Sequence, residues 1–125
     1  MEKQPRECTE GPCPVETTLK VIGGKWKAMI IYHLLDEKKR FNKLKRMMPD
    51  ITHRMLTLQL RELEKDNILT RTVFPEVPPR VEYELTVLGR SIEPIIMAIH
   101  RWGVAYQKNI GDAKNIKDAE DFIQV

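Results

Sequence analysis

The clearest hydrophobic pattern in the chain runs from Thr52 to Asn67, which reads THRMLTLQLRELEKDN. Leu56, Leu60 and Leu63 recur at spacings of four and three, which places them on one stripe of a helix. Thr52 is suited to cap its first turn, because a threonine oxygen accepts from an otherwise unpaired N–H group there. Facing away from the stripe are short polar and cationic side chains: His53, Arg54, Thr57 and Arg61. The segment predicts an amphipathic helix with an exposed, partly cationic face.

Three shorter helices are predicted ahead of it. Residues 15–22 place Val15, Leu19 and Ile22 on one side and stop at two glycines. Residues 25–35 are apolar around most of their circumference, as expected for the centre of a small core. After a charged turn at 36–40, residues 42–48 form a third short helix, and a Pro-Asp turn leads into the leucine-striped helix. Two helices joined by a brief turn predict a helix-turn-helix.

The hydrophobic period changes after Asn67, a residue able to take a left-handed conformation. Residues 68–74 and 80–86 alternate apolar and polar positions and are rich in β-branched and aromatic side chains. Between them PEVPP supplies a rigid tip that cannot extend a strand ladder. We therefore expect a β-hairpin directly after the leucine-striped helix, a wing, in a mainly α fold.

The last predicted helix, residues 87–106 with Thr86 as its cap, is more apolar than one neighbour can cover. Pro94 is expected either to kink this helix or to mark its regular start. Its apolar positions recur at helical spacing: Ile92, Ile95, Ile96, Ile99, Trp102 and Tyr106. Because this apolar surface is larger than the rest of the domain can cover, we expect a partner subunit to bury it.

Charge is unevenly distributed along the 125 residues, although the net charge is only +3. Residues 20–80 contain 14 Lys and Arg against 7 Asp and Glu, whereas the remainder contains 7 against 11. A basic stretch around the predicted helix-turn-helix is typical of a surface that binds a polyanion. We expect one domain at 13–111, a flexible segment at 1–12 and an acidic tail at 112–125. No apolar run approaches the roughly 18 to 20 residues of a membrane-spanning helix, and no signal-peptide pattern is present, so we expect a cytoplasmic protein.

Catalytic, cofactor and metal sites are not predicted. The histidines His33, His53 and His100 fall on three different elements with no ligand partner at helical spacing. The sequence has no G-x-S-x-G motif, no phosphate-binding glycine loop and no paired carboxylates in a cleft-like context. The two cysteines, Cys8 and Cys13, lack the C-x-x-C spacing of redox enzymes and are too few for a structural zinc site.

The order of the predicted elements and the sequences of several segments resemble those of the HxlR-type winged helix-turn-helix regulators, which are related in fold to the MarR regulators. The residues that carry the likeness are CPVETTLKVIGGKWKAMIIYHLL from Cys13, RFNKLKRMMPDITHRMLTLQLRELEKDNIL from Arg40, PPRVEYELTVLGRSI from Pro78 and HRWG ending at Gly103. The resemblance implies that the helix after Thr52 reads the DNA major groove and that Arg80 approaches the phosphates or the minor groove. It also implies dimerisation through the first helix, with Leu19, and the last.

On a DNA-binding surface, phosphate contacts set most of the affinity and base-edge contacts discriminate sequence. We expect base contacts from His53, Arg54, Thr57 and Arg61, with Leu58 also pointing outward. The expected phosphate contacts are Lys25, Lys38, Lys39, Lys43, Lys45, Thr52 and Arg80. Two recognition helices in a homodimer would lie about 34 to 36 Å apart and require double-stranded DNA with a pseudo-palindromic operator.

Cys13 matches a cysteine just before PVE through which some members of the family respond to oxidants or electrophiles. It also lies at the predicted start of the first helix, where the helix dipole favours the reactive thiolate. Cys8 is a candidate to resolve an oxidised Cys13, and a bond between subunits is equally open. The alternative to redox sensing is that Cys13 is a structural cysteine with no signalling role. The alternative to DNA binding is that the winged helix binds another protein. Whether the protein represses or activates stays open.

Overall fold

The structure is a computed structural model that describes residues 11–111. Cys8, most of the expected flexible segment 1–12 and the expected acidic tail 112–125 lie outside the described residues. The described residues divide into two compact units, one up to Arg90 and one from Ser91 onward.

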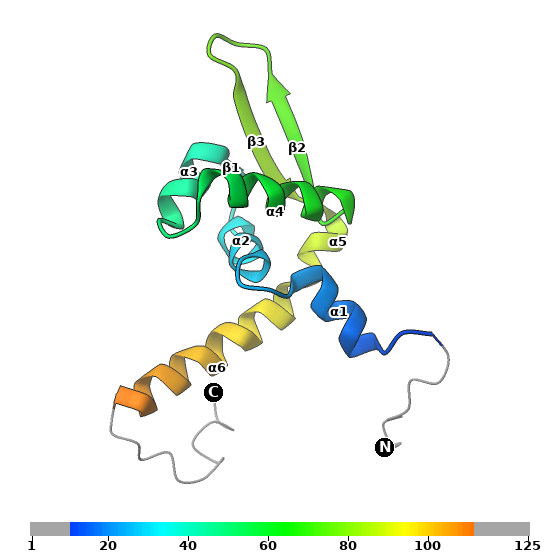
Figure 1. The fold of residues 1–125 in the computed structure, drawn as a ribbon, viewed down its shortest axis with the longest axis vertical. Helices are drawn as coiled ribbons and strands as arrows, with labels where there is room; N and C mark the ends of the chain where they lie inside the picture. Colours follow the sequence, from blue (N-terminus) through cyan, green and yellow to red (C-terminus); the bar gives the residue numbers. More distant parts are fainter. Residues whose placement is uncertain (1–10, 112–125) are drawn as a thin grey trace. The chain divides into compact units, whose positions relative to one another are not determined.

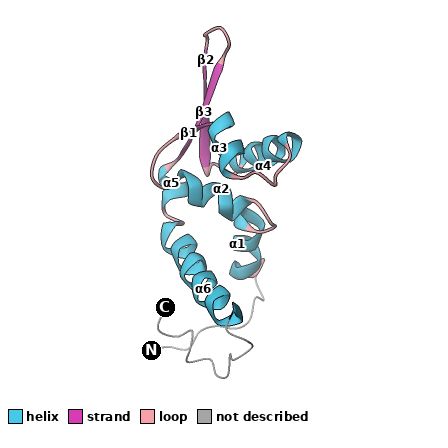
Figure 2. Ribbon diagram, turned by 90° about the vertical axis from the view of Figure 1, so that its left-hand side faces the viewer, coloured by secondary structure: helices cyan, strands magenta, loops and turns pink. Residues whose placement is uncertain are grey.

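The first unit contains the helix-turn-helix and the wing. Its helices and strands follow in this order: α1 (Pro14–Ile22), α2 (Lys27–Leu34), β1 (Lys39–Arg40), α3 (Phe41–Met47), α4 (His53–Lys65), β2 (Leu69–Phe74), β3 (Arg80–Leu85) and α5 (Val87–Arg90). Both views show the β2–β3 hairpin extending away from the helices, with α3 and α4 near its base (Figures 1 and 2). The predicted mainly α fold with a hairpin wing is confirmed.

A single hydrophobic core holds this unit together. α2 contributes Ile30, Ile31 and Leu34, which are fully buried, as expected for its nearly all-apolar surface. The leucine stripe of α4 meets them, because α2 packs on α4. Leu44, Met48, Ile51, Ile68, Leu69, Tyr83 and Leu85 complete the core from α3, the turns and the sheet. The polar face of α4 is thereby directed outward.

The sheet has three antiparallel strands in the order β1-β3-β2 rather than the two expected. Lys39 pairs with Tyr83 and Arg40 with Glu82, so residues we expected in a charged turn form a short strand beside the hairpin. In the hairpin, Leu69 pairs with Leu85 and Phe74 with Arg80. This third strand fixes the base of the wing to the chain that leads into α3.

The second unit consists of α6 (Glu93–Gly111). The single helix expected at 87–106 is therefore wrong: α5 ends at Arg90, and α6 starts with Pro94 as its second residue. Of the two roles weighed for Pro94, the helix start is the one observed, since proline is tolerated in the first turn. Among the described residues, none of the helices combines the length and apolar character needed to cross a membrane.

Candidate nucleic-acid interface

Helix α4 presents the predicted recognition face. The Thr52 hydroxyl oxygen accepts from the backbone N–H of Met55 at 3.0 Å, which confirms the predicted N-cap. Leu56, Leu60 and Leu63 are buried, and the opposite face carries a shallow hollow. The hollow is lined by His53, Arg54, Thr57, Leu58 and Arg61. The structure thus brings the four expected base-contacting residues and Leu58 to one surface.

Two of these side chains are held by local contacts. The Thr57 hydroxyl donates to the backbone carbonyl of His53 at 3.0 Å, within the helix. The His53 ring lies against Phe41 of α3, with ring centroids 4.6 Å apart. Since Phe41 opens α3, this contact joins the exposed start of α4 to the first helix of the helix-turn-helix.

A larger groove of about 610 Å³ lies between α4 and the wing. The wing here means β2, β3 and the tip at residues 75–79. Four arginines from different elements line the groove: Arg40, Arg61, Arg71 and Arg80. Glu64 and Glu76 line it too, so it is cationic but not exclusively so. A cationic groove beside an exposed helix face is suited to a nucleic-acid backbone.

Arg40 and Arg71 were not among the residues expected at the site. Arg71 lies opposite Tyr83 in the β2–β3 register, and this pairing, which the sequence alone does not give, brings it to the groove. Arg40 has no sequence signal either, and it reaches the groove only because β1 pairs with β3.

Tyr83 lines the groove from β3 and is itself buried. Burial raises the pKa of the Tyr83 hydroxyl, an effect that Arg71 opposes through its charge and a side-chain hydrogen bond. The hydroxyl therefore stays protonated at neutral pH. It offers the groove a neutral hydrogen-bonding group beside the arginines.

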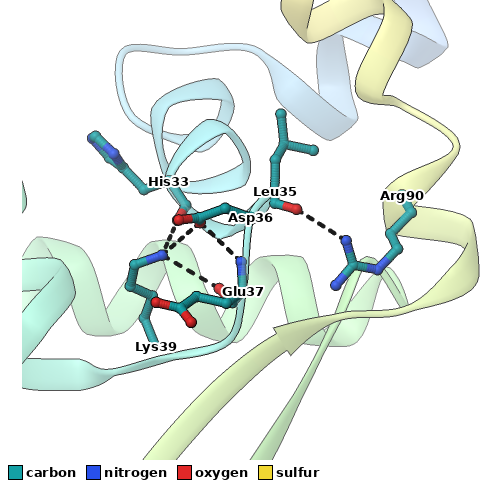
Figure 3. Close-up of polar contacts among 6 residues, drawn as sticks. All are labelled: His33, Leu35, Asp36, Glu37, Lys39 and Arg90. Atoms are coloured by element: carbon teal, nitrogen blue, oxygen red, sulfur yellow. Dashed lines mark hydrogen bonds and ion pairs between the residues drawn. The ribbon is translucent and has the colours of Figure 1, made fainter.

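Lys39 does not belong to the DNA-facing surface, and its assignment as a phosphate contact is wrong. Its side chain is only 5% exposed, and its ammonium donates to the carbonyl of His33 at 2.8 Å and to the Asp36 carboxylate at 2.7 Å. A third, longer contact reaches the carbonyl of Glu37 (Figure 3). With these acceptors in place, the ammonium fastens the end of α2 and cannot reach a phosphate.

The other expected phosphate contacts lie on the surface. Lys25, Lys38 and Lys43 are exposed, and Lys45 is half-buried. Lys25 lies over the ring of Trp26, and Lys38 pairs with Glu82 at 3.4 Å. None of the four lines the groove beside α4. Their contact with DNA remains a prediction.

Residues 21–110 match the family model described as HxlR-like helix-turn-helix. The chain belongs to the HxlR-like helix-turn-helix family. It is 54% identical to the uncharacterized HTH-type transcriptional regulator YdeP of Bacillus subtilis (strain 168) over 111 residues, 89% of this chain and 87% of that protein. The resemblance seen in the sequence is confirmed.

Two solved structures extend this result to the fold. The redox regulator HypR in its oxidized form has a TM-score of 0.70 at 60% identity, covering 73% of this chain and 94% of that chain. The reduced form of the transcriptional regulator YodB from B. subtilis has a TM-score of 0.65 at 30% identity, covering 86% of this chain and 100% of that chain. As an HxlR-like protein, the chain is a DNA-binding transcriptional regulator with a winged helix fold and not an enzyme.

The HxlR-like match begins at residue 21, near the end of α1, so Cys13 at the start of that helix lies ahead of the matched residues. Cys13 is the N-cap residue of α1 and is half-buried, and its carbonyl accepts from the N–H of Thr17. Leu19, on the same helix, is exposed. The structure thus places Cys13 at the helix start that the sequence predicted.

Helix α6 carries an exposed apolar face. Ile95, Ile99, Trp102 and Tyr106 are exposed, and the Trp102 and Tyr106 rings stack with centroids 4.9 Å apart. Ile92 is half-buried and Ile96 is buried. Within residues 11–111, no cluster of His, Cys, Asp or Glu is arranged to hold a metal ion.

Proposed function

We propose that this regulator binds DNA sequence-specifically as a homodimer on a pseudo-palindromic operator. In this proposal α4 enters the major groove, and the groove between α4 and the wing receives the phosphate backbone. The supporting observation is that a helix fixed by three buried leucines directs a polar, cationic face outward beside three further arginines of the groove. The face consists of His53, Arg54, Thr57 and Arg61, and the three arginines are Arg40, Arg71 and Arg80. Rigid presentation of short polar and cationic side chains is what base-edge reading requires.

Each side chain has a distinct role in this proposal. Arg54 and Arg61 can each donate to O6 and N7 of a guanine, and the methyl group of Thr57 can contact a thymine methyl. Lys25, Lys38, Lys43, Lys45, Thr52 and Arg80 are the proposed backbone contacts, now joined by Arg40 and Arg71 from the groove. Phosphate contacts carry no sequence information but fix the register on the duplex.

Selection of bound fragments from a random duplex pool tests sequence specificity. We expect enrichment of a two-fold symmetric motif, and Arg54→Ala should lose about 1 to 3 kcal/mol on that motif and relax one base position per half-site. Lys65→Ala is the matched control, because Lys65 is exposed at the far end of α4 and does not line the hollow. Enrichment of no motif, or equal effects of the two variants, would contradict the assignment.

A winged helix that binds an acidic protein is the competing function. DNA binding through phosphates releases counterions and weakens steeply as salt rises. We therefore expect duplex affinity to fall steeply in a salt titration, with no binding to an acidic control protein. Equal affinity for both ligands would favour the protein-interaction alternative.

We further propose that oxidation or electrophile modification of Cys13 controls operator binding. The support is its place at the start of α1, where the dipole of a helix favours thiolate, and the similarity to the redox regulator HypR. Diamide accepts two electrons and two protons from a pair of thiols and leaves a disulfide. The second thiol would be Cys8 or a cysteine of a partner subunit.

Diamide treatment of wild type, Cys13→Ser and Cys8→Ser tests this proposal. We expect the wild type to change operator affinity on oxidation and to recover with dithiothreitol, whereas Cys13→Ser should not respond. Cys8→Ser shows whether Cys8 is the second thiol. An identical response of wild type and Cys13→Ser would remove Cys13 from the mechanism.

A further inference from the structure

Arg80, at the start of β3, is held by three groups of the wing. Its guanidinium carbon lies 4.0 Å from the centre of the Phe74 ring. One terminal nitrogen is 3.3 Å from a carboxylate oxygen of Glu76, and Nε is 3.4 Å from a carboxylate oxygen of Glu82. Nε is buried, and the Glu82 contact is an ion pair without hydrogen-bond alignment. The cation expected to meet DNA is therefore already engaged within its own hairpin.

The carboxylates near Arg80 offset its positive charge. Residues 74–82 contain Arg80 as their one cation and two carboxylates, Glu76 and Glu82. Lys38 pairs with Glu82, which brings the four groups to zero net charge. Because these four charges sum to zero, Arg80 adds little attraction for a phosphate while both carboxylates stay beside it. Its contribution rises when one carboxylate moves away.

The two carboxylates differ in how firmly they are held. The Glu82 side chain is 15% exposed, lies in β3 opposite Thr72 and Arg40, and bridges Arg80 and Lys38. The Glu76 side chain is 50% exposed and belongs to the tip, outside both strands. Glu76 is consequently the group that can leave, whereas Glu82 remains and keeps the arginine in place.

We propose that Glu76 competes with the DNA phosphate for Arg80 and so sets the affinity of the wing for DNA, with Glu82 as the residue that positions Arg80. The inference rests on the proposed placement of the wing against the DNA backbone. On binding, a phosphate oxygen replaces the Glu76 carboxylate at the guanidinium. Phosphate carries no base identity, so Glu76 lowers affinity for every sequence by the same factor.

The test compares Glu76→Gln with Glu84→Gln on two probes, a mixed-sequence duplex and the best duplex from selection. Glu84 is the matched control, because it is an exposed carboxylate on the same hairpin, whereas the ion pairs of Arg80 are with Glu76 and Glu82. Glu76→Gln should tighten binding about twofold to fivefold on both probes, since exposed ion pairs contribute up to about 1 kcal/mol. Glu84→Gln should produce a smaller change.

Two further measurements isolate the arginine. In an Arg80→Gln background, the additional gain from Glu76→Gln should disappear, because there is no cation left to release. The advantage of Glu76→Gln should also shrink as salt rises, since salt screens the exposed pair in the wild type. Melting temperatures of all variants establish that each is folded.

The inference is overturned if Glu76→Gln and Glu84→Gln behave alike, if the gain persists without Arg80, or if it is confined to the selected duplex. In each case wild-type binding to DNA would be intact, so the proposed function would stand. If the wild type binds neither duplex, the proposed function and this inference fall together.

Discussion

Lys39 shows how a residue in a basic stretch can serve the fold instead of the ligand. Its ammonium binds the carbonyls of His33 and Glu37 and the carboxylate of Asp36, beside the end of α2. Carbonyls at a helix end have no partner within the helix, so a buried cation there satisfies them. Arg90 makes a related contact, donating to the carbonyl of Leu35 at 3.1 Å (Figure 3).

Replacing Lys39 should therefore weaken the fold. We expect Lys39→Met to lower the free energy of unfolding by about 1 to 3 kcal/mol, because it removes the donor to the part-buried His33 and Glu37 carbonyls. Urea denaturation followed by circular dichroism measures the loss. Lys43→Met is the control: Lys43 is exposed, so stability should change by less than about 0.5 kcal/mol while the salt slope of DNA binding falls by about 1. The reverse pattern would restore Lys39 to the DNA surface.

His33 makes the stability of the same region depend on pH. Burial, and then the positive charge of Lys39, hold the pKa of His33 below its ordinary value of 6.5, with Asp36 opposing them. The folded state thus binds the proton less readily than the unfolded state, and stability falls as pH drops below about 6.5.

We expect the melting temperature of the wild type to fall between about pH 7 and pH 5. His33→Gln should fall less over this window, because it removes the group whose folded-state pKa is lowered. The Asp36 pKa is also lowered from 3.8, so its contribution is lost only at more acidic pH. Parallel curves for the two proteins would show that His33 does not cause the dependence.

At the scale of elements, Thr86 joins the base of the wing to the turn after α4. Its hydroxyl donates to the carbonyl of Asn67 at 2.7 Å, lies 3.1 Å from that of Ile68, and accepts from the N–H of Gly89 at 2.9 Å. Gly89 is required at its position, because a Cβ would come within 2.1 Å of the Ile68 carbonyl oxygen. These contacts fix where the hairpin leaves the helix-turn-helix.

We expect Thr86→Val to lower the free energy of unfolding by about 1 to 2 kcal/mol, because the cap and the carbonyl contact are both lost. Thr86→Ser should retain most of the free energy of unfolding, because the serine hydroxyl can make the same hydrogen bonds. Thr70→Val is the control, since the Thr70 hydroxyl is exposed and makes only a 3.4 Å contact to the carbonyl of Glu84. Thermal denaturation distinguishes them, and an equal loss for both valine variants would refute the role of Thr86.

Elements with strong periodicity could be predicted from the sequence. The leucine stripe predicted α4, Thr52 predicted its cap, and Asn67 has the left-handed backbone expected of it, with φ of 62°. β1 could not be predicted, because two cationic residues have no hydrophobic pattern and pair only in the presence of β3. The break between α5 and α6 was missed because the apolar spacing continues through it.

The candidate site follows the same division. Residues on the polar face of α4 could be named, since helical phase alone separates them from the buried leucines. Arg40 and Lys39 are adjacent in a basic run, yet one lines the groove and the other is buried. Successive side chains of a strand point to opposite faces, so Lys39 and Arg40 separate in β1. That strand forms only in the folded protein, where it pairs with β3.

At the scale of the whole molecule, the proposed homodimer assigns the exposed apolar face of α6 to a partner subunit. Ile99 and Val104 are nearly equally exposed, at 49% and 51%, but they lie on different faces of the helix. Ile95, Ile99, Trp102 and Tyr106 lie within a narrow sector, and Val104 lies about half a turn away from its centre. A dimer formed through the sector should depend on Ile99 and not on Val104.

We expect Ile99→Lys to shift sedimentation from dimer to monomer, because a charge at the centre of an apolar interface must be desolvated. Val104→Lys should leave the dimer intact. On DNA, the dimer should tolerate insertion of a full helical turn between half-sites better than insertion of half a turn, which rotates one half-site to the opposite side of the duplex. The Ile99→Lys monomer should be indifferent to both insertions. If Val104→Lys separates the subunits equally well, or if spacing has no effect on the wild type, the two-fold arrangement on DNA is wrong.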